Sequence, residues 1–382
     1  MSEKIKLGEL GEVVSGSTPK TNIKDYWDGE ILWITPAEIQ EDDYYIADTQ
    51  RKITNLAVDK TNLKLLPKGT VLLSSRAPIG KVAICDNDMY CNQGFKNIIC
   101  SDRLENRYVY YFLKYNVEYI KSLGRGATFK EISKGIVENL EIPYIEKKEQ
   151  IEIANKLDKI TEILKIKKQQ IKQFDEIIKS QFVEMFQSGN YPKEELGKLC
   201  DVRDGTHDSP KYLEESGYKF ITSKNIINNE IDFSEVKYIS KQDYDKFNTR
   251  SKVNYGDILM PMIGTIGKPM IVNIPDDEID FAIKNVALIK FLGNSQVTNI
   301  YIKNLLDSDY FENAILQNKR GGTQKFIALS DIRKMQIEIP PIELQNQFAD
   351  IVKQIDKQKF EIESSLREMQ ELYEALMERY FG

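Results

Sequence analysis

The sequence has few of the residues that metal centres and covalent mechanisms commonly use. Its 382 residues include one histidine, His207, and four cysteines. A single histidine excludes histidine-cluster metal sites and mechanisms that need two histidines. The cysteines lack the short paired spacings of zinc and redox motifs, so we expect them to be reduced packing residues. We therefore predict that this chain holds no metal. The cysteines are Cys85, Cys91, Cys100 and Cys200.

Long apolar runs are also missing. No run approaches the roughly 18–20 apolar residues that a membrane span needs, and the start lacks a secretory pattern. We expect a cytoplasmic protein with no membrane partner. Lys and Arg number 53 against 59 Asp and Glu, which gives a net charge of −6. This balance argues against a generally basic nucleic-acid coat but permits local basic patches.

Motifs for nucleotide hydrolysis and acyl transfer are not present either. A phosphate-binding loop needs a glycine five residues before its Gly-Lys pair. Ser75 occupies that position before Gly80, and Met262 occupies it before Gly267. The single histidine lies in the turn-like stretch "DGTHDSP", where a polar turn residue is favoured over a Ser-His-Asp site. We predict no catalytic residue in this chain.

What the sequence does contain is an internal repeat, which decides the architecture. The matching segments occur in the same order in both halves. The offset drifts only from 187 (221 − 34) to 197 (337 − 140), as loop insertions would cause. The chain is therefore a tandem duplication. The paired segments are 6–20 with 195–211, 32–39 with 219–226, 68–81 with 255–268, "RGATFKEI" at 125–132 with "RGGTQKFI" at 320–327, and 140–150 with 337–347.

Each repeat has a globular part and a long helical part. Short β-branched runs with Gly and Pro punctuation, followed by helical stretches, indicate α/β (α+β) domains. Prolines before each long helical stretch favour a helix start. We predict domain 1 at residues 1–145, a helix at 146–188, domain 2 at residues 189–341 and a second helix at 342–382.

Both long helices show the alternating three- and four-residue spacing of a coiled-coil seam. We predict that they pair antiparallel, although they could instead lie on their own domains as amphipathic helices. Roughly 35–40 residues make a rod of about 50–60 Å, longer than the 34 Å or so of one B-DNA turn. Polar residues at Lys167, Gln181, Gln358, Ser365 and Arg379 would fix partner and register. The apolar seam residues are Leu157, Ile160, Leu164, Ile171, Phe174, Ile178 and Met185, then Ile355, Ile362, Met369, Leu372 and Leu376.

The paired "IGK" loops, the RGAT and RGGT loops, and the helix starts "IPYIEKKEQ" and "IPPIELQNQ" resemble the specificity (S) subunit of a type I restriction-modification system. The resemblance covers essentially the whole chain. It implies that each target-recognition domain reads one half of a split double-stranded DNA site. It also implies that the coiled coil sets the gap and docks two methyltransferase (M) subunits.

The same resemblance places the chemistry on other subunits. The M subunits would methylate adenine with S-adenosylmethionine, and in many such systems two R subunits add ATP- and Mg-dependent translocation and cleavage. Methyltransferases of this kind carry an Asn/Asp-Pro-Pro-Tyr/Phe motif. The only Pro-Pro pair here, Pro340–Pro341, lies between isoleucines. We expect this chain to bind no cofactor.

Several loops combine the residue types that contact DNA. Arg and Lys suit guanine and phosphate, and Asn and Gln suit adenine. Features shared by both copies, Gly-Lys and Arg-Gly-x-Thr, would serve phosphate contact or folding. Base readers should lie where the copies differ: at Thr128, Phe129 and Glu131 against Gln324 and Phe326, or at 75–77 against 261–263. The predicted DNA-contacting residues are Arg76, Lys81, Arg125, Thr128, Lys130, Lys224, Asn225, Thr265, Lys268, Arg320, Thr323, Gln324 and Lys325.

Two other functions fit the same sequence. One is the specificity component of a bipartite type II restriction-modification enzyme with the same domain plan. The other is a coiled-coil adaptor that binds no DNA, which the modest net charge permits.

Overall fold

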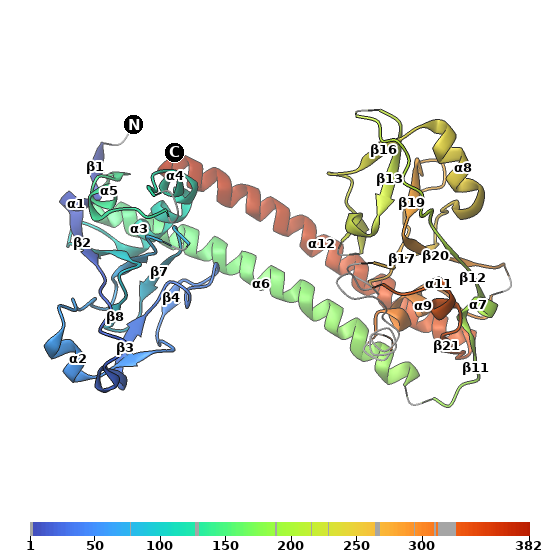
Figure 1. Ribbon diagram of the computed structural model, residues 1–382, viewed down its shortest axis with the longest axis horizontal. Helices are drawn as coiled ribbons and strands as arrows, with labels where there is room; N and C mark the ends of the chain where they lie inside the picture. The colour runs from blue at the N-terminus through green and yellow to red at the C-terminus, as the bar shows by residue number, and fades with distance from the viewer. Residues whose placement is uncertain are drawn as a thin grey trace. The chain divides into compact units, whose positions relative to one another are not determined.

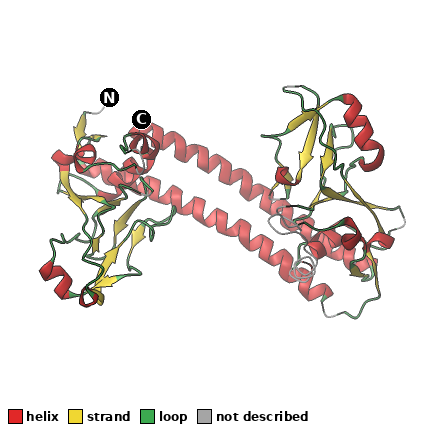
Figure 2. Ribbon diagram, viewed as in Figure 1, coloured by secondary structure: helices red, strands yellow, loops and turns green. Residues whose placement is uncertain are grey.

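The protein folds into two compact units. The structure, a computed structural model, describes residues 3–76, 78–126, 130–187, 189–214, 216–227, 229–263, 268–293, 295–308, 311 and 326–382. The first unit comprises Met1–Lys168 and Glu363–Gly382, and the second comprises Gln169–Ile362. Both ends of the chain therefore belong to the first unit (Figure 1). Each unit combines one globular domain with parts of the two long helices, and both domains mix strands and helices (Figure 2).

The first unit is built on two sheets. The first has the order β2 (Gly11–Ser15), β9 (Lys96–Cys100), β6 (Val71–Leu73), β7 (Val82–Cys85) and β4 (Tyr45–Ile46); the second has the order β5 (Lys52–Ile53), β3 (Trp27–Ile34) and β8 (Tyr90–Cys91). Every residue of β6 and β7 is buried, as expected of apolar strands that are covered on both faces. Strand β1 (Lys4–Lys6) pairs with β10 (Glu141–Pro143). The helices are α1 (Leu7–Leu10), η1 (Lys24–Tyr26), α2 (Asn55–Lys60), α3 (Asn106–Tyr115), α4 (Val117–Ser122) and α5 (Lys134–Glu138).

The second unit repeats this plan. Its sheets have the orders β12 (Cys200–Asp204), β20 (Val286–Phe291), β17 (Ile258–Pro261) and β18 (Met270–Ile271), and β16 (Lys237–Ile239), β13 (Tyr218–Thr222) and β19 (Phe281–Lys284). Strand β14 (Ile226–Ile227) pairs with β15 (Glu230–Ile231), and β11 (Lys193–Glu195) pairs with β21 (Gln336–Glu338). The helices of its described residues, apart from the long ones, are α7 (Leu196–Leu199), η2 (Ser223–Asn225), α8 (Lys241–Ser251), α9 (Asn299–Leu306) and α11 (Leu329–Arg333). Mixed α/β domains in tandem are therefore observed.

The two copies are offset by 195 residues at their ends, which corrects the alignment made from the sequence. Ile142 pairs with Ile5 in β10, and Ile337 pairs with Glu194 in β21. Ile142 is therefore equivalent to Ile337 (337 − 142 = 195) and not to Ile339, which the sequence comparison chose. The comparison matched Ile142-Pro143 to Ile339-Pro340 because both pairs have the same letters. The first pair lies inside β10, but the second follows the end of β21, two residues further along the repeat.

The long helices begin at equivalent residues. Helix α6 spans Lys147–Phe186 and α12 spans Ile342–Phe381, each 40 residues long. Gln150 is fully buried and donates to the carbonyls of Ile145 (2.8 Å) and Arg103 (3.1 Å). Gln345 is also fully buried and donates to the carbonyls of Pro340 (2.9 Å) and Gln296 (3.0 Å). The offset of 195 (345 − 150) thus continues into the helices, and the sequence comparison wrongly equated Gln150 with Gln347.

In the first unit, the end of α12 packs beside the start of α6. Met377 and Phe381 share a buried apolar cluster with Ile153 and Leu157. The ring of Phe381 also lies 5.0 Å from that of Tyr108 in α3, measured between ring centroids. The last turns of α12 are therefore part of the core of this unit.

The second unit has the equivalent arrangement with the helices exchanged. Phe186, at the end of α6, lies 4.9 Å from the ring of Tyr301 in α9 and 5.4 Å from that of Phe348 near the start of α12. Lys359 of α12 forms an ion pair with Asp175 of α6 at 2.7 Å. Here the start of α12 lies beside the end of α6.

The seam residues predicted on α6 are all buried or half-buried: Leu157, Ile160 and Leu164 in the first unit, and Ile171, Phe174, Ile178 and Met185 in the second. On α12, Ile355 is buried, and Ile362, Met369 and Leu376 are half-buried.

Leu372 is the exception on α12, because its side chain is 47% exposed. After Met369 the apolar spacing continues with a step of four residues to Tyr373, which packs against the core of the first unit. Burial raises the pKa of Tyr373 to about 12. The prediction placed Leu372 in the seam because it used a step of three residues at this point.

Candidate nucleic-acid interface

Backbone hydrogen bonds bring three loops of domain 1 together. The Ser75 N–H donates to the carbonyl of Gly94 at 2.7 Å, and the Ile132 N–H donates to the carbonyl of Ser75 at 3.0 Å. Arg125 and Glu131 exchange two backbone hydrogen bonds of 3.0 Å. The segments at residues 74–76, 92–94, 125–126 and 130–131 therefore form one loop cluster.

Cationic side chains of several predicted residues lie in this cluster. Arg125 and Lys130 are exposed, and Arg76 is half-buried next to Glu131 in a backbone bridge. Lys96 is 8% exposed, and its ammonium lies 3.3 Å from a carboxylate oxygen of Glu131. Glu131 thus compensates the buried charge, while Arg125 and Lys130 remain exposed.

Lys81, one of the predicted DNA-contacting residues, makes two hydrogen bonds within domain 1. Its ammonium donates to the carbonyls of Pro36 (3.0 Å) and Ile39 (2.5 Å). These bonds tie the loop at 74–81 to the segment after β3. The sequence left two roles open for the Gly-Lys pair, phosphate contact and folding, and these contacts support folding.

The equivalent loops of domain 2 meet through equivalent backbone bonds. The Met262 N–H donates to the carbonyl of Asn285 at 3.3 Å, and the Ile327 N–H donates to the carbonyl of Met262 at 3.0 Å. Ile263 forms a backbone bridge with Phe326, whose side chain is exposed. The predicted residues Thr128, Thr265, Arg320, Thr323, Gln324 and Lys325 lie outside the described residues.

Asn225, one of the predicted DNA-contacting residues, completes a capping box whose N-cap is Thr222. Its side-chain oxygen accepts hydrogen bonds from the N–H and hydroxyl of Thr222, at 3.0 and 2.9 Å, and its amide nitrogen donates to the carbonyl of Asp232. Glu38 accepts the same pair of bonds from Thr35 in domain 1. The shared Thr-x-x-Asn/Glu spacing is therefore a capping motif.

Lys224 and Lys268 remain candidates for contact with DNA. Lys224 is exposed on η2, directly before the capping Asn225. Lys268 has a side chain that is 67% exposed, and its ammonium is 3.7 Å from a carboxylate oxygen of Asp307. Pairs this exposed are worth little energy, so Lys268 can exchange its partner for a phosphate.

The sequence analysis missed the turns that connect the two sheets of each domain. In domain 1 the turn "NQG" at 92–94 lies between β8 and β9, and in domain 2 Asn285 lies between β19 and β20. The Gln93 side chain is exposed, and Asn285 has a φ of 53°. An Asn/Gln-Gly pair between two apolar runs is a turn signal that could have identified the first of them.

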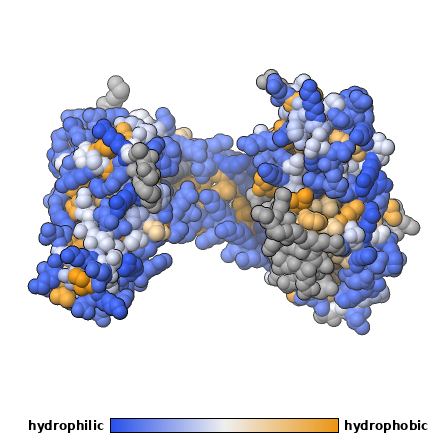
Figure 3. Space-filling view, viewed as in Figure 1, coloured by the Kyte–Doolittle hydropathy of each residue, from blue (hydrophilic) through white to orange (hydrophobic). Residues whose placement is uncertain are grey.

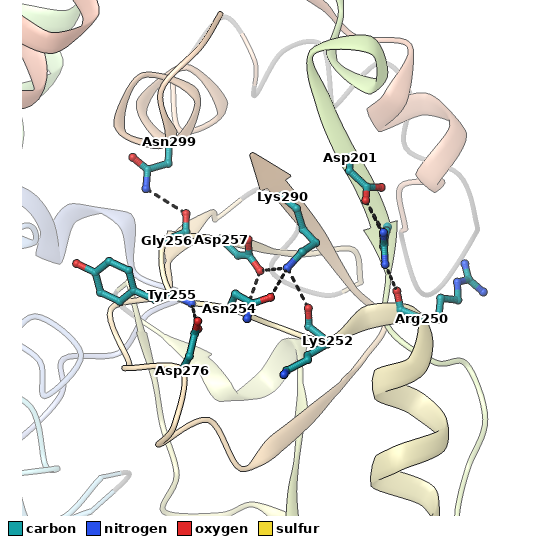
Figure 4. Close-up of polar contacts among 11 residues, drawn as sticks. Asp201, Arg250, Lys252, Asn254, Tyr255, Gly256, Asp257, Asp276, Lys290 and Asn299 are labelled. Atoms are coloured by element: carbon teal, nitrogen blue, oxygen red, sulfur yellow. Dashed lines mark hydrogen bonds and ion pairs between the residues drawn. The ribbon is translucent and has the colours of Figure 1, made fainter. Parts of the chain in front are cut away.

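A network of polar side chains around Lys290 links several segments of domain 2. The Lys290 ammonium is bonded to the Lys252 carbonyl at 3.0 Å, to the Asn254 side chain at 2.9 Å and to Asp257 (Figure 4). Burial raises the pKa of Asp257, and the bond from Lys290 opposes that rise. Asn299 of α9 donates to the carbonyl of Gly256 in the same turn. These groups are satisfied by one another, so we assign them to the stability of domain 2.

Burial also accounts for the thiols. It raises the pKa of Cys91, Cys100 and Cys200 to about 12 and raises that of Cys85 further. Thiolates are therefore scarce at neutral pH, and these cysteines are packing residues. Among the described residues, no group of three or more His, Cys, Asp or Glu side chains is placed to hold a metal. In the same part of the chain, no helix is long and apolar enough to cross a membrane.

Comparison with known proteins identifies the family. The profile of the type I restriction modification DNA specificity domain matches residues 2–174 and 190–371, once for each repeat. The duplicated fold and its paired loop clusters thus define a tandem DNA-specificity protein. The chain belongs to the family of specificity subunits of type I restriction-modification systems.

Two curated relatives cover almost the whole chain. It is 30% identical to the type I restriction enzyme MjaIX specificity subunit of Methanocaldococcus jannaschii, over 97% of this chain and 90% of the relative. It is 23% identical to the MjaVIII specificity subunit of the same organism, over 97% of this chain and 91% of that relative.

Solved structures share the fold. The S subunit of a type I restriction-modification system from M. genitalium has a TM-score of 0.61 at 17% identity, covering 100% of this chain and 96% of that one. A chain from a study of complex assembly and conformational transition of the type I R-M system has a TM-score of 0.59 at 16% identity, covering 99% and 97%.

Proposed function

We propose that this chain is a noncatalytic DNA-binding subunit in which each domain reads one half of a bipartite double-stranded target. Helices α6 and α12 pair as an antiparallel coiled coil, which sets the gap between the half-sites and docks two methyltransferase subunits. S-adenosylmethionine binds to those subunits, and where a nuclease accompanies the complex, R subunits bring ATP and Mg. No chemical step is assigned to this chain.

The observation that carries the proposal is the duplicated loop cluster. Ser75 accepts a backbone hydrogen bond from Ile132, and Met262 accepts one from Ile327. Each also donates one to the turn that connects the two sheets of its domain. The backbone frame is therefore shared, while the side chains on it differ. A common frame with different polar side chains suits two readers that bind one kind of polymer at two sequences.

The helix contacts within each unit support antiparallel pairing. The end of α12 packs beside the start of α6 in the first unit, and the start of α12 packs beside the end of α6 in the second. A parallel pair would bring like ends together. At about 1.5 Å per residue, a helix of 40 residues is about 60 Å long. That length is sufficient to separate two half-sites by more than one turn of DNA.

The salt dependence of DNA binding tests the proposal. Phosphate contacts make the logarithm of affinity fall linearly with the logarithm of salt concentration. We expect the full chain, assembled with its methyltransferase partner, to be retained on duplex DNA with such a slope. Retention that does not change with salt, or that is missing at low salt, would support a DNA-independent adaptor instead.

A further inference from the structure

The turns that connect the two sheets contact the same neighbouring loop in both domains. In domain 1 the N–H of Ser17 donates to the carbonyl of Cys91 at 2.9 Å. In domain 2 the N–H of Thr206 donates to the carbonyl of Ile283 at 3.1 Å. The next residues in the two loops, Thr18 and His207, are therefore equivalent.

Each of these equivalent residues holds a side-chain amide of the turn. The Thr18 hydroxyl donates to the side-chain oxygen of Gln93. His207 Nδ1 lies 2.7 Å from the side-chain oxygen of Asn285. The domain 2 turn is one residue shorter, so the correspondence is between the turns and not between Gln93 and Asn285 as aligned residues. The recurrence shows that the fold places an oriented amide at this point twice, with different chemistry.

Within the domain 1 turn, only one of the two amides is available to a ligand. The Asn92 side-chain oxygen accepts a hydrogen bond from the N–H of Gly94 at 2.8 Å and so stabilises the turn. Gln93 is exposed, and its amide nitrogen has no hydrogen bond to the described part of the chain. Gly94 joins this turn to Ser75, the neighbour of Arg76 in the loop cluster. Gln93 therefore borders the cationic residues that are placed to contact the DNA backbone.

The orientation of Gln93 matches one base. A glutamine amide binds adenine in the major groove when its oxygen accepts from N6 and its nitrogen donates to N7. The Thr18 hydroxyl uses one lone pair of the oxygen, which leaves the second lone pair and both N–H groups free. In this arrangement the oxygen end of the amide lies at Thr18, and the amide nitrogen is left to donate.

We propose that Gln93 reads an adenine in the half-site bound by domain 1, and that Thr18 is the residue that positions its amide. This inference rests on the proposed DNA-binding function and adds the base and the side chain that reads it. Phosphate contacts by Arg76, Arg125 and Lys130 would hold the loop cluster in register but carry no sequence information.

Selection from a library of duplexes with randomised half-sites tests this assignment. The full chain with its methyltransferase partner is used as wild type and as Gln93→Ala, Gln93→Glu and Thr18→Val. Gln50→Ala is the matched control, because Gln50 is exposed elsewhere in the same domain. Thermal unfolding of each variant verifies that it remains folded.

We expect Gln93→Ala to lower discrimination for adenine by about 5- to 150-fold at one position of one half-site. Thr18→Val should lower it at the same position by less. Gln93→Glu should shift the preference there toward cytosine, whose amino group a carboxylate accepts. Gln50→Ala should leave every position unchanged.

An unchanged preference in Gln93→Ala, or an equal loss at all positions, would overturn the assignment of Gln93 while the wild type still selects a bipartite site. A wild type that selects no bipartite site would instead refute the proposed function itself. The two failures are therefore distinguishable in one experiment.

Discussion

At the residue scale, the polar groups that the protein already satisfies are separate from those left for a ligand. The Lys81 ammonium donates to two backbone carbonyls, and the Asn225 amide is hydrogen-bonded to Thr222 and Asp232. Lys130 and Gln93 lie on two other loops of domain 1, and their side chains are exposed. Residue type alone does not distinguish these cases, because a lysine in a glycine-containing loop suits phosphate binding and loop anchoring equally.

Replacing Lys81 should change the stability of the protein, whereas replacing Lys130 should change the salt dependence of DNA binding. Lys81→Met leaves two backbone carbonyls without a donor, so we expect a loss of about 1–3 kcal/mol in the free energy of unfolding. The salt slope of DNA binding should not change. Lys130→Met should keep the stability within about 0.5 kcal/mol and reduce the salt slope by about one.

Tryptophan fluorescence during urea unfolding measures the stability effect selectively. The chain has two tryptophans, Trp27 and Trp33, and both lie in domain 1 with Lys81 and Lys130. Equal stability of the two variants would contradict the structural role of Lys81, and an unchanged slope for Lys130→Met would remove it from the DNA contacts.

At the element scale, the spacing of apolar residues was a better guide to the structure than the alignment of similar segments in the two repeats. The seam spacing selected residues of α6 that are all buried or half-buried, because sustained three- and four-residue steps define a single stripe on a helix. The alignment of "IEIP" placed the copies two residues out of register. Equivalent strand residues are defined by the register of the backbone pairing. A short apolar motif can recur by chance a few residues away, so it does not fix that register.

The register of 195 residues predicts which glutamine stabilises the second unit. Gln345→Ala removes the hydrogen bonds to Pro340, Gln296 and the Thr298 N–H, so we expect a loss of about 1–3 kcal/mol. Gln347→Ala changes an exposed residue and should stay within about 0.5 kcal/mol. Hydrogen exchange of α9 and the start of α12 reports the change. A larger loss from Gln347→Ala would restore the register inferred from the sequence.

The contact between helices in the second unit predicts an energetic coupling. The rings of Phe182 in α6 and Phe348 in α12 lie 5.4 Å apart in an edge-to-face arrangement. In a double-mutant cycle of Phe→Leu changes, we expect these residues to couple by about 0.5–1.5 kcal/mol.

Phe360, which is 64% exposed on α12, is the control and should not couple with Phe182. Coupling for the control pair and none for Phe182 with Phe348 would contradict antiparallel packing of the helices in this unit. Urea unfolding followed by circular dichroism at helical wavelengths supplies the free energies.

At the scale of the whole molecule, duplication explains both the order of the elements and the differences between the loops. The fold repeats the same strand-and-helix plan, and its helix ends are equivalent at an offset of 195 residues. The visible face of each unit is mainly hydrophilic (Figure 3). The sequence predicted the duplication because repeats survive as ordered matches. It did not predict Gln93, since the amide's position depends on Thr18, which lies 75 residues away.

Exchange of one domain tests the central claim most directly. Residues 1–145 are replaced by the corresponding domain of a relative with another specificity, and the sequences bound and methylated with the methyltransferase partner are mapped. The account predicts that one half of the bipartite sequence changes, while the other half and the gap remain the same. A change in both halves, or in neither, would contradict the reading of one half-site by each domain.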